Sequence, residues 1–232
     1  MYIKNIIHNY PEFRLNIKDI NLENNRIIGL IGENGAGKTT LMNILSGLQN
    51  ANELFNCEES DSDNILYVPS NIEPFDYMSV MEFVDIIRKY SKSKKSNSEI
   101  LQDLELEDKK DTMVNSLSQG MKKKLTLINV FLYDYSLVIL DEPFNSVDVK
   151  YIYQLKKMLI ELKKRTTILI SSHILDTLND ICDNFVYLKN GEVIKTFSNN
   201  HDITVLEREL FDWNFLDWIT VNKTTIWYIW FF

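Results

Sequence analysis

Apolar and polar residues alternate at the start of the chain, and continuous apolar runs follow. Phe13, Leu15 and Ile17 alternate with polar residues, and Asn24 and Asn25 supply turn residues before the first run. Alternation predicts a half-buried strand, whereas a short continuous run predicts a fully buried one. The continuous runs lie at 27–31, 65–68, 137–140 and 167–170. We therefore expect strands in the first thirty residues and buried strands at the later runs.

Helical spacing dominates the middle of the chain. Apolar residues recur three and four positions apart at Val80, Phe83, Val84, Ile87 and Tyr90, and again at Ile100, Leu101 and Leu104. This spacing predicts a helical insertion at about 71–135. A further helix is predicted at 151–164 and a closing hairpin at 186–194. Helices that alternate with buried strands indicate an α/β fold with a mostly parallel sheet.

A glycine-rich octapeptide at 32–39 fits the pattern GxxxxGK[ST], at the point where a predicted strand turns into a helix. Its glycines allow successive backbone N–H groups to form a nest for anionic oxygens. Lys38 adds a positive charge, Thr39 offers a hydroxyl to Mg²⁺, and the dipole of the following helix faces the phosphates. The residues expected to hold a nucleoside triphosphate are Gly32, Asn34, Gly35, Gly37, Lys38, Thr39 and Thr40. The alternative is a chance glycine-rich turn.

Two adjacent carboxylates, Asp141 and Glu142, end the apolar run at 137–140. Side chains on a strand alternate in direction, so the two are expected to have different tasks. Asp141 would help to place Mg²⁺, directly or through water, and Glu142 would orient and deprotonate the attacking water. The alternative is a solvent-exposed pair at a strand end. His173 follows the next predicted strand and is expected to contact the γ-phosphate. The alternative is a histidine that packs in the core or caps a helix.

Composition and charge restrict the class of protein. The chain has 232 residues, of which 45% are hydrophobic and 25% charged, so it is expected to be globular. Its net charge of −8 argues against a nucleic-acid partner, because phosphate affinity comes from clustered Lys and Arg. The cysteines Cys57 and Cys182 stand too far apart in sequence for a zinc motif. No run approaches the roughly 20 apolar residues that span a bilayer.

The segment at 117–125, Leu-Ser-Gln-Gly-Met-Lys-Lys-Lys-Leu, resembles the signature motif of ATP-binding cassette (ABC) proteins. The order of the other motifs agrees: 32–39 is similar to Walker A, 137–142 to Walker B, 145–148 to the D-loop, and His173 to the switch histidine. The resemblance implies a P-loop NTPase core with an N-terminal β subdomain and the inserted helical subdomain, and it implies ATP and Mg²⁺ as cofactors. It also implies that Ser118 and Gly120, at a helix start, contact ATP bound to another subunit.

This sequence departs from the family pattern in places. Ser70 stands where the family has the Q-loop glutamine, and its shorter side chain would reach Mg²⁺ only through water. The signature resembles that of exporters of the bacitracin-resistance, lantibiotic-immunity and sodium-extrusion kind. Tyr10 is expected to stack on adenine, with Phe13 as the competing aromatic residue.

The resemblance implies an ATP-hydrolysing subunit of an ABC transporter of the export type, within residues 1–212. Its partners would be transmembrane permease subunits and a second copy of the chain or a sister ATPase. Its expected location is the cytoplasmic face of the cell membrane, as a peripheral protein. The alternatives are a soluble single-cassette ATPase that remodels a protein assembly and a binding module without turnover. The aromatic tail at 213–232 would pack on the core or a dimer, contact a membrane surface, or reflect a frameshift.

Overall fold

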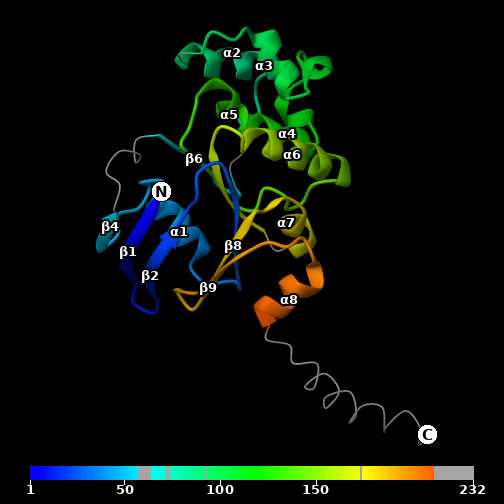
Figure 1. The fold of residues 1–232 in the computed structure, drawn as a ribbon. Coiled ribbons are helices and arrows are strands. Elements are labelled where there is room, and N and C mark those ends of the chain that lie inside the picture. The colour runs from blue at the N-terminus through cyan, green and yellow to red at the C-terminus, as the bar shows by residue number, and fades with distance from the viewer. Residues whose placement is uncertain (57–63, 72–73, 92, 173, 212–232) are drawn as a thin grey trace, which may run out of the picture.

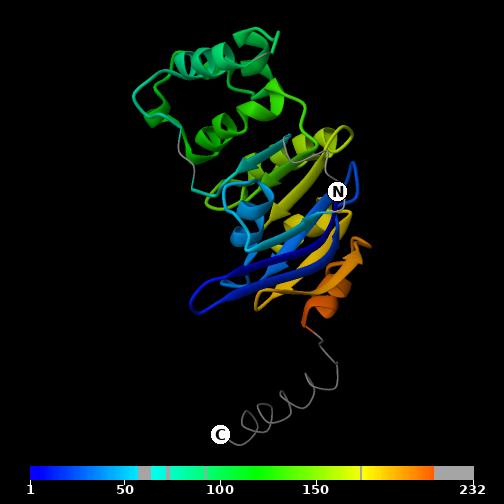
Figure 2. The same ribbon diagram turned by 90° about the vertical axis from the view of Figure 1, so that its left-hand side faces the viewer.

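The computed structural model describes residues 1–56, 64–71, 74–91, 93–172 and 174–211. In this part of the chain, one sheet runs in the order β4-β1-β2-β9-β8-β3-β7-β6-β5 (Figures 1 and 2). The strands are β1 Tyr2–Asn9, β2 Arg14–Asn21, β3 Ile27–Gly32, β4 Glu53–Asn56, β5 Ile65–Val68, β6 Leu137–Leu140, β7 Thr167–Ser171, β8 Asn184–Lys189 and β9 Glu192–Ser198.

The strands β8, β3, β7, β6 and β5 form a parallel half of the sheet. Every residue of β6 and β7 is buried, which explains why their sequences are continuous apolar runs. The carboxyl ends of β3, β5, β6 and β7 lie along one edge of the sheet because these strands are parallel. The predicted α/β fold with a mostly parallel core is thus confirmed.

The strands β1, β2 and β4 form an antiparallel half. β9 joins the two halves, because it pairs antiparallel with β8 and parallel with β2 at Asn16 and Glu192. The predicted N-terminal β region is therefore continuous with the main sheet. The stretch that begins at Glu53 is acidic and polar with no sustained period, yet 53–56 pairs with β1 as an edge strand. Tertiary pairing here outweighs a weak local pattern.

Helices cover both faces of the sheet. α1, Lys38–Leu45, packs on the face that includes Ile28 and Leu30. The other face, which includes Ile27 and Ile31, packs against α6, α7 and α8. Their bounds are α6 Val149–Leu162, α7 Leu175–Ile181 and α8 Ile203–Phe211. Alternate residues of one strand thus serve two separate cores.

The helical insertion forms a third core and projects from the sheet in both ribbon views (Figures 1 and 2). Its elements are α2 Val80–Tyr90, α3 Asn97–Asp103, η1 Glu107–Lys109, η2 Val114–Ser116, α4 Gln119–Thr126 and α5 Ile128–Leu132. Ser79 and Ser96 begin α2 and α3 with capping boxes, which satisfy the first backbone N–H groups of each helix. The helical elements lie inside the predicted range of 71–135.

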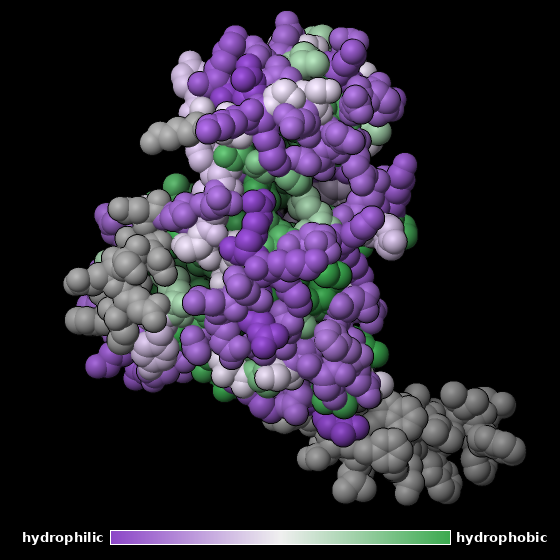
Figure 3. Space-filling view, turned by 45° about the horizontal axis from the view of Figure 1, so that its top comes forward, coloured by the Kyte–Doolittle hydropathy of each residue, from purple (hydrophilic) through white to green (hydrophobic). Residues whose placement is uncertain are grey.

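The face seen in Figure 3 is covered mainly by hydrophilic residues. Among the residues that the structure describes, no helix combines the length and the apolar character needed to cross a bilayer. The aromatic tail predicted at 213–232 lies outside the described residues.

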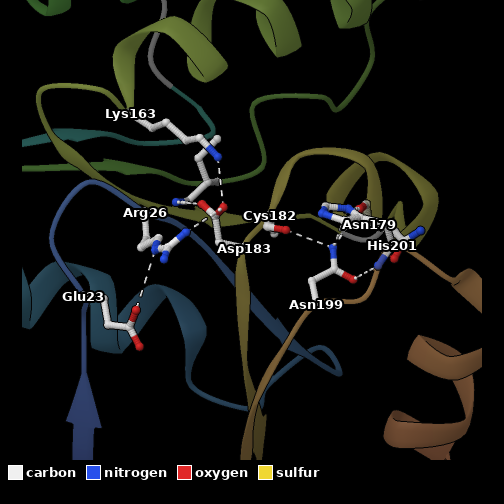
Figure 4. Close-up of polar contacts among 9 residues, drawn as sticks. Glu23, Arg26, Lys163, Asn179, Cys182, Asp183, Asn199 and His201 are labelled. Atoms are coloured by element: carbon white, nitrogen blue, oxygen red, sulfur yellow. Dashed lines mark hydrogen bonds and ion pairs between the residues drawn. The ribbon is translucent and has the colours of Figure 1, made fainter.

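A polar cluster fixes the amino ends of the central strands (Figure 4). The carboxylate of Asp183 accepts hydrogen bonds from the backbone N–H of Ile27, at 2.8 Å, and from Lys163 Nζ, at 2.9 Å. Arg26 lies 3.5 Å from the same carboxylate. Asp183, the residue that precedes β8, thereby joins the start of β3 to the end of α6. This cluster lies at the opposite ends of the parallel strands from the edge where β3, β6 and β7 end.

Candidate functional site

A cavity of about 420 Å³ opens where the central parallel strands end. It brings together residues from the phosphate loop, from the end of β6 and from the loop after β5. The residues that line it are Phe13, Asn34, Gly35, Gly37, Lys38, Thr39, Thr40, Ser70, Asp141 and Glu142. Most of the residues predicted to hold nucleotide, metal or water therefore share one cavity.

The phosphate loop depends on two glycines with different roles. Gly37 precedes α1 with φ of +103°, and a Cβ there would lie 2.7 Å from a side-chain carbon of Leu15. Only glycine fits this left-handed, crowded position. Gly32 does not line the cavity. A Cβ on Gly32 would lie 2.4 Å from the carbonyl oxygen of Leu188, so this glycine allows β3 to approach β8.

Lys38 is 9% exposed and folds back on its own loop. Its Nζ donates to the carbonyl oxygens of Gly32, at 2.7 Å, and Glu33, at 3.1 Å. Burial lowers the pKa of Lys38, while the charges of Glu142 and Asp141 oppose that shift. The loop thus holds the Lys38 ammonium near the carboxylates of Asp141 and Glu142, at the N-terminus of α1.

Asp141 is the centre of the polar contacts in this cavity. Thr39 Oγ1 donates to its Oδ2 at 3.1 Å, and Ser171 Oγ donates to its Oδ1 at 2.7 Å. The Tyr67 hydroxyl lies 3.5 Å from Oδ2. Burial, together with the nearby Asp141 carboxylate, raises the pKa of Tyr67 to about 12. The phenol therefore stays protonated beside Asp141 at neutral pH.

Glu142 is 7% exposed and has a left-handed backbone with φ of +50°. Its backbone N–H donates to Ser171 Oγ at 2.9 Å. The one hydroxyl of Ser171 thus contacts both Asp141 and Glu142 from the end of β7. Ser171 and Tyr67 are not among the predicted site residues, although Ser171 directly follows the apolar run at 167–170, two positions before His173. His173 itself lies outside the described residues.

The predicted signature residues lie in a different hollow, of about 260 Å³. Ser118 begins α4, and its side chain accepts a hydrogen bond from the backbone N–H of Met121 at 3.3 Å. Gly120 is buried in the first turn of the same helix. Neither residue lines the phosphate-loop cavity. Within this chain, the structure does not bring Ser118 and Gly120 to the phosphate loop.

The two candidate aromatic residues differ in their relation to the cavity. Phe13 lines it, whereas Tyr10 is not among its lining residues. Tyr10 is 42% exposed, and its hydroxyl accepts a hydrogen bond from Gln49 at 2.7 Å. The centroids of the two rings are 6.3 Å apart. Phe13 is therefore the ring that faces the phosphate-loop cavity directly.

Comparison with known proteins decides the family. The family model described as ABC transporter matches residues 15–145, which include the phosphate loop, the signature segment and both carboxylates. The chain belongs to the ABC transporter family. It is one of the ATP-binding cassettes of that family, as the resemblance of its motifs implied.

The relatives of this ABC cassette agree with that assignment. The ABC-type transporter ATP-binding protein EcsA of Bacillus subtilis is 32% identical over 74% of this chain and 76% of its own length. The uncharacterized ABC transporter ATP-binding protein YxlF of the same organism is 31% identical over 73% of this chain and 60% of its own length. The matched region thus spans less than two thirds of YxlF.

A solved structure of the ATP-binding subunit of an ABC transporter has a TM-score of 0.71 to this chain and 26% sequence identity. The match covers 90% of this chain and 92% of that one. It confirms the P-loop NTPase fold of the ABC cassette. The exporter subtype and the roles of individual site residues stay predictions.

Proposed function

We propose that this protein hydrolyses ATP and that ATP binding and hydrolysis drive transport by separate membrane subunits. The observation that carries the proposal is the contact of Thr39 with Asp141 at 3.1 Å, in the cavity that Lys38 and Glu142 also line. A cation, a hydroxyl and two carboxylates converge there beside a helix N-terminus. Positioning and charge stabilisation of this kind are what phosphoryl transfer requires of a protein.

The phosphates would bind to the backbone N–H groups of residues 34–40 and to Lys38. On binding, Lys38 Nζ would exchange its contacts with the carbonyls of Gly32 and Glu33 for phosphate oxygens. The exchange replaces neutral acceptors by charged ones, which strengthens each hydrogen bond. Phe13 would lie against the adenine ring.

The donor set fits Mg²⁺. The described residues contain no cluster of three or more His, Cys, Asp or Glu that could hold a metal ion. Mg²⁺ needs no such cluster, because it binds through one or two carboxylates, water and substrate phosphates. Thr39 and Asp141 would supply oxygen ligands, and Ser70 lines the same cavity. When bound, Mg²⁺ would neutralise charge on the phosphate oxygens.

Glu142 would act as the general base for the attacking water. It lines the cavity and is 7% exposed, so its position is set by the residues around it. Ser171 fixes its backbone N–H, which restricts where the carboxylate can point. His173 would contact the γ-phosphate.

Two chains would be needed for each reaction. Ser118 and Gly120 line a hollow separate from the phosphate loop, and a helix N-terminus of this kind suits an anion. We propose that the hollow receives the γ-phosphate of ATP held by a second copy or a sister ATPase. ATP would then join the two chains, and hydrolysis would release them.

Permease subunits would dock near Ser70 and the helical insertion, which places the protein on the cytoplasmic face of the membrane. The test is purification of the tagged chain from detergent-solubilised native membranes with ATP and Mg²⁺, followed by mass spectrometry. Recovery of a polytopic membrane protein supports the proposal. Recovery with soluble partners alone contradicts it and favours a remodelling ATPase.

A further inference from the structure

The three consecutive lysines of α4 make different contacts. Lys122 pairs with Asp76 at 3.2 Å, and Lys124 pairs with Glu105 at 3.1 Å. Lys123 instead donates to a backbone carbonyl, the oxygen of Asn145, at 2.6 Å. Its Nζ also lies 3.5 Å from the carbonyl oxygen of Glu142. The middle lysine thus reaches from the helical insertion to the loop that carries the candidate general base.

That loop has an unusual backbone. Glu142 and Ser146 both have left-handed conformations, with φ of +50° and +59°. Non-glycine residues avoid this region, and they remain there only when surrounding contacts hold them. The backbone N–H of Asn145 donates to the carbonyl oxygen of Glu142 at 3.2 Å, so the loop closes on itself. Lys123 binds both carbonyls of this turn from outside.

Glu142 is therefore held on both sides of its own backbone. Ser171 accepts from its N–H at 2.9 Å, and Lys123 approaches its carbonyl. Ser171 belongs to the end of β7, in the sheet, whereas Lys123 belongs to α4, in the helical insertion. A displacement of α4 relative to the sheet would act directly on the peptide units around Glu142.

The surroundings of Lys123 keep its contact strong. Burial lowers the pKa of the Lys123 ammonium, and the charge of Glu142 opposes that shift. A partly desolvated ammonium bonds a carbonyl more strongly than a solvated one does. Removal of the Lys123 ammonium would take away the hydrogen bond that the carbonyl oxygen of Asn145 accepts from it, at a cost in free energy.

We propose that Lys123 is a positioning residue for Glu142, which connects the signature helix to the turn that carries the general base. The inference rests on the proposed function, because it assigns Glu142 the role given there. Lys123 does not line the phosphate-loop cavity, so its effect is expected on turnover and not on nucleotide affinity.

The test compares Lys123→Met with Lys122→Met, which removes a charge from the same helix without touching the turn at 142–146. We expect Lys123→Met to lower kcat by about 10- to 100-fold, the scale of a small misplacement of a catalytic group. KM and ATP affinity should stay within about twofold, and Lys123→Arg should restore most of kcat. Lys122→Met should leave kcat within about twofold of the wild type.

Hydrogen exchange supplies a measurement that does not need turnover. We expect faster exchange of the backbone N–H groups of residues 142 and 144–146 in Lys123→Met than in the wild type. An unchanged kcat with unchanged exchange overturns the inference. Equal losses of kcat, affinity and thermal stability, without rescue by Lys123→Arg, also overturn it and assign Lys123 a structural role. A wild-type protein without ATP turnover contradicts the proposed function instead, and the exchange result then decides the inference separately.

Discussion

The hydroxyl of Thr39 lies 3.1 Å from Oδ2 of Asp141, although the two residues are 102 positions apart in sequence. The contact joins the first turn of α1 to the end of β6. It is possible because β3 and β6 are parallel and are separated in the sheet only by β7. The sheet itself therefore holds in place the two oxygens that we propose as Mg²⁺ ligands.

Loss of the Thr39 hydroxyl should weaken metal-dependent binding. We expect Thr39→Val to reduce affinity for ATP with Mg²⁺ by about tenfold, because the variant keeps the shape of the side chain and loses an oxygen ligand. Affinity for ATP in EDTA should change little. Thr39→Ser, which keeps the hydroxyl, serves as the control. Equal losses with and without Mg²⁺ in equilibrium binding would show that Thr39 does not act through the metal.

Phe13 should contribute more to nucleotide affinity than Tyr10, since Phe13 alone of the two lines the cavity. Stacking of a base on an aromatic ring contributes about 1–3 kcal/mol, so Phe13→Ala should weaken ATP binding by about tenfold. Tyr10→Ala should change it by less than about twofold. Binding of inorganic tripolyphosphate separates stacking from damage to the loop and should be unaffected by Phe13→Ala. The reverse order of the two variants would restore Tyr10 as the stacking residue.

Removal of the Ser171 hydroxyl should impair turnover as well as stability. Ser171→Ala leaves the buried N–H of Glu142 without its acceptor, which costs about 1–3 kcal/mol of unfolding free energy. It also frees the Asp141 carboxylate to rotate, so kcat should fall. The matched control is Thr167→Ala, at the other end of β7, where the hydroxyl accepts from the backbone N–H of Asn25. Both variants should have a lower free energy of unfolding in denaturant, whereas only Ser171→Ala should have a lower kcat in steady-state kinetics.

The Asp183 cluster should make stability depend on pH in the acid range. Burial opposes ionisation of Asp183, but the Ile27 N–H and the charges of Lys163 and Arg26 outweigh it and lower its pKa. The folded state therefore binds this proton more weakly than the unfolded chain does. The resulting stability is complete above the ordinary Asp pKa and is lost as pH falls through the lowered value.

Asp183→Asn should accordingly lower the unfolding free energy at neutral pH by about 1 kcal/mol, a small value because solvent screens Arg26. The difference from the wild type should shrink as the pH falls below the ordinary Asp pKa and should be lost once the pH is below the lowered pKa of Asp183. Urea unfolding between neutral and acid pH measures it. A constant difference at every pH would show that the charge of Asp183 is not what stabilises the strand ends.

The sequence predicted those features that depend on local spacing. The phosphate loop needs glycines and Lys38 at fixed intervals, and Asp141 must end a buried strand, so both can be recognised without a structure. Ser171 and Lys123 could not be recognised in this way, because their partners lie 29 and 22 positions away and the contacts depend on sheet order and helix placement. The choice between Phe13 and Tyr10 likewise depends on which side of the β1–β2 turn faces the cavity.

The most direct test of the central claim compares ATP binding and ATP turnover in the wild type and in Glu142→Gln, with Mg²⁺ present. The substitution keeps the size of the side chain and removes its basicity. We predict that turnover falls by about 100-fold or more, the scale of general-base catalysis, while the affinity for ATP stays at the wild-type value. Undiminished turnover in Glu142→Gln would contradict the assignment of Glu142, and with it the hydrolytic site proposed for this cavity.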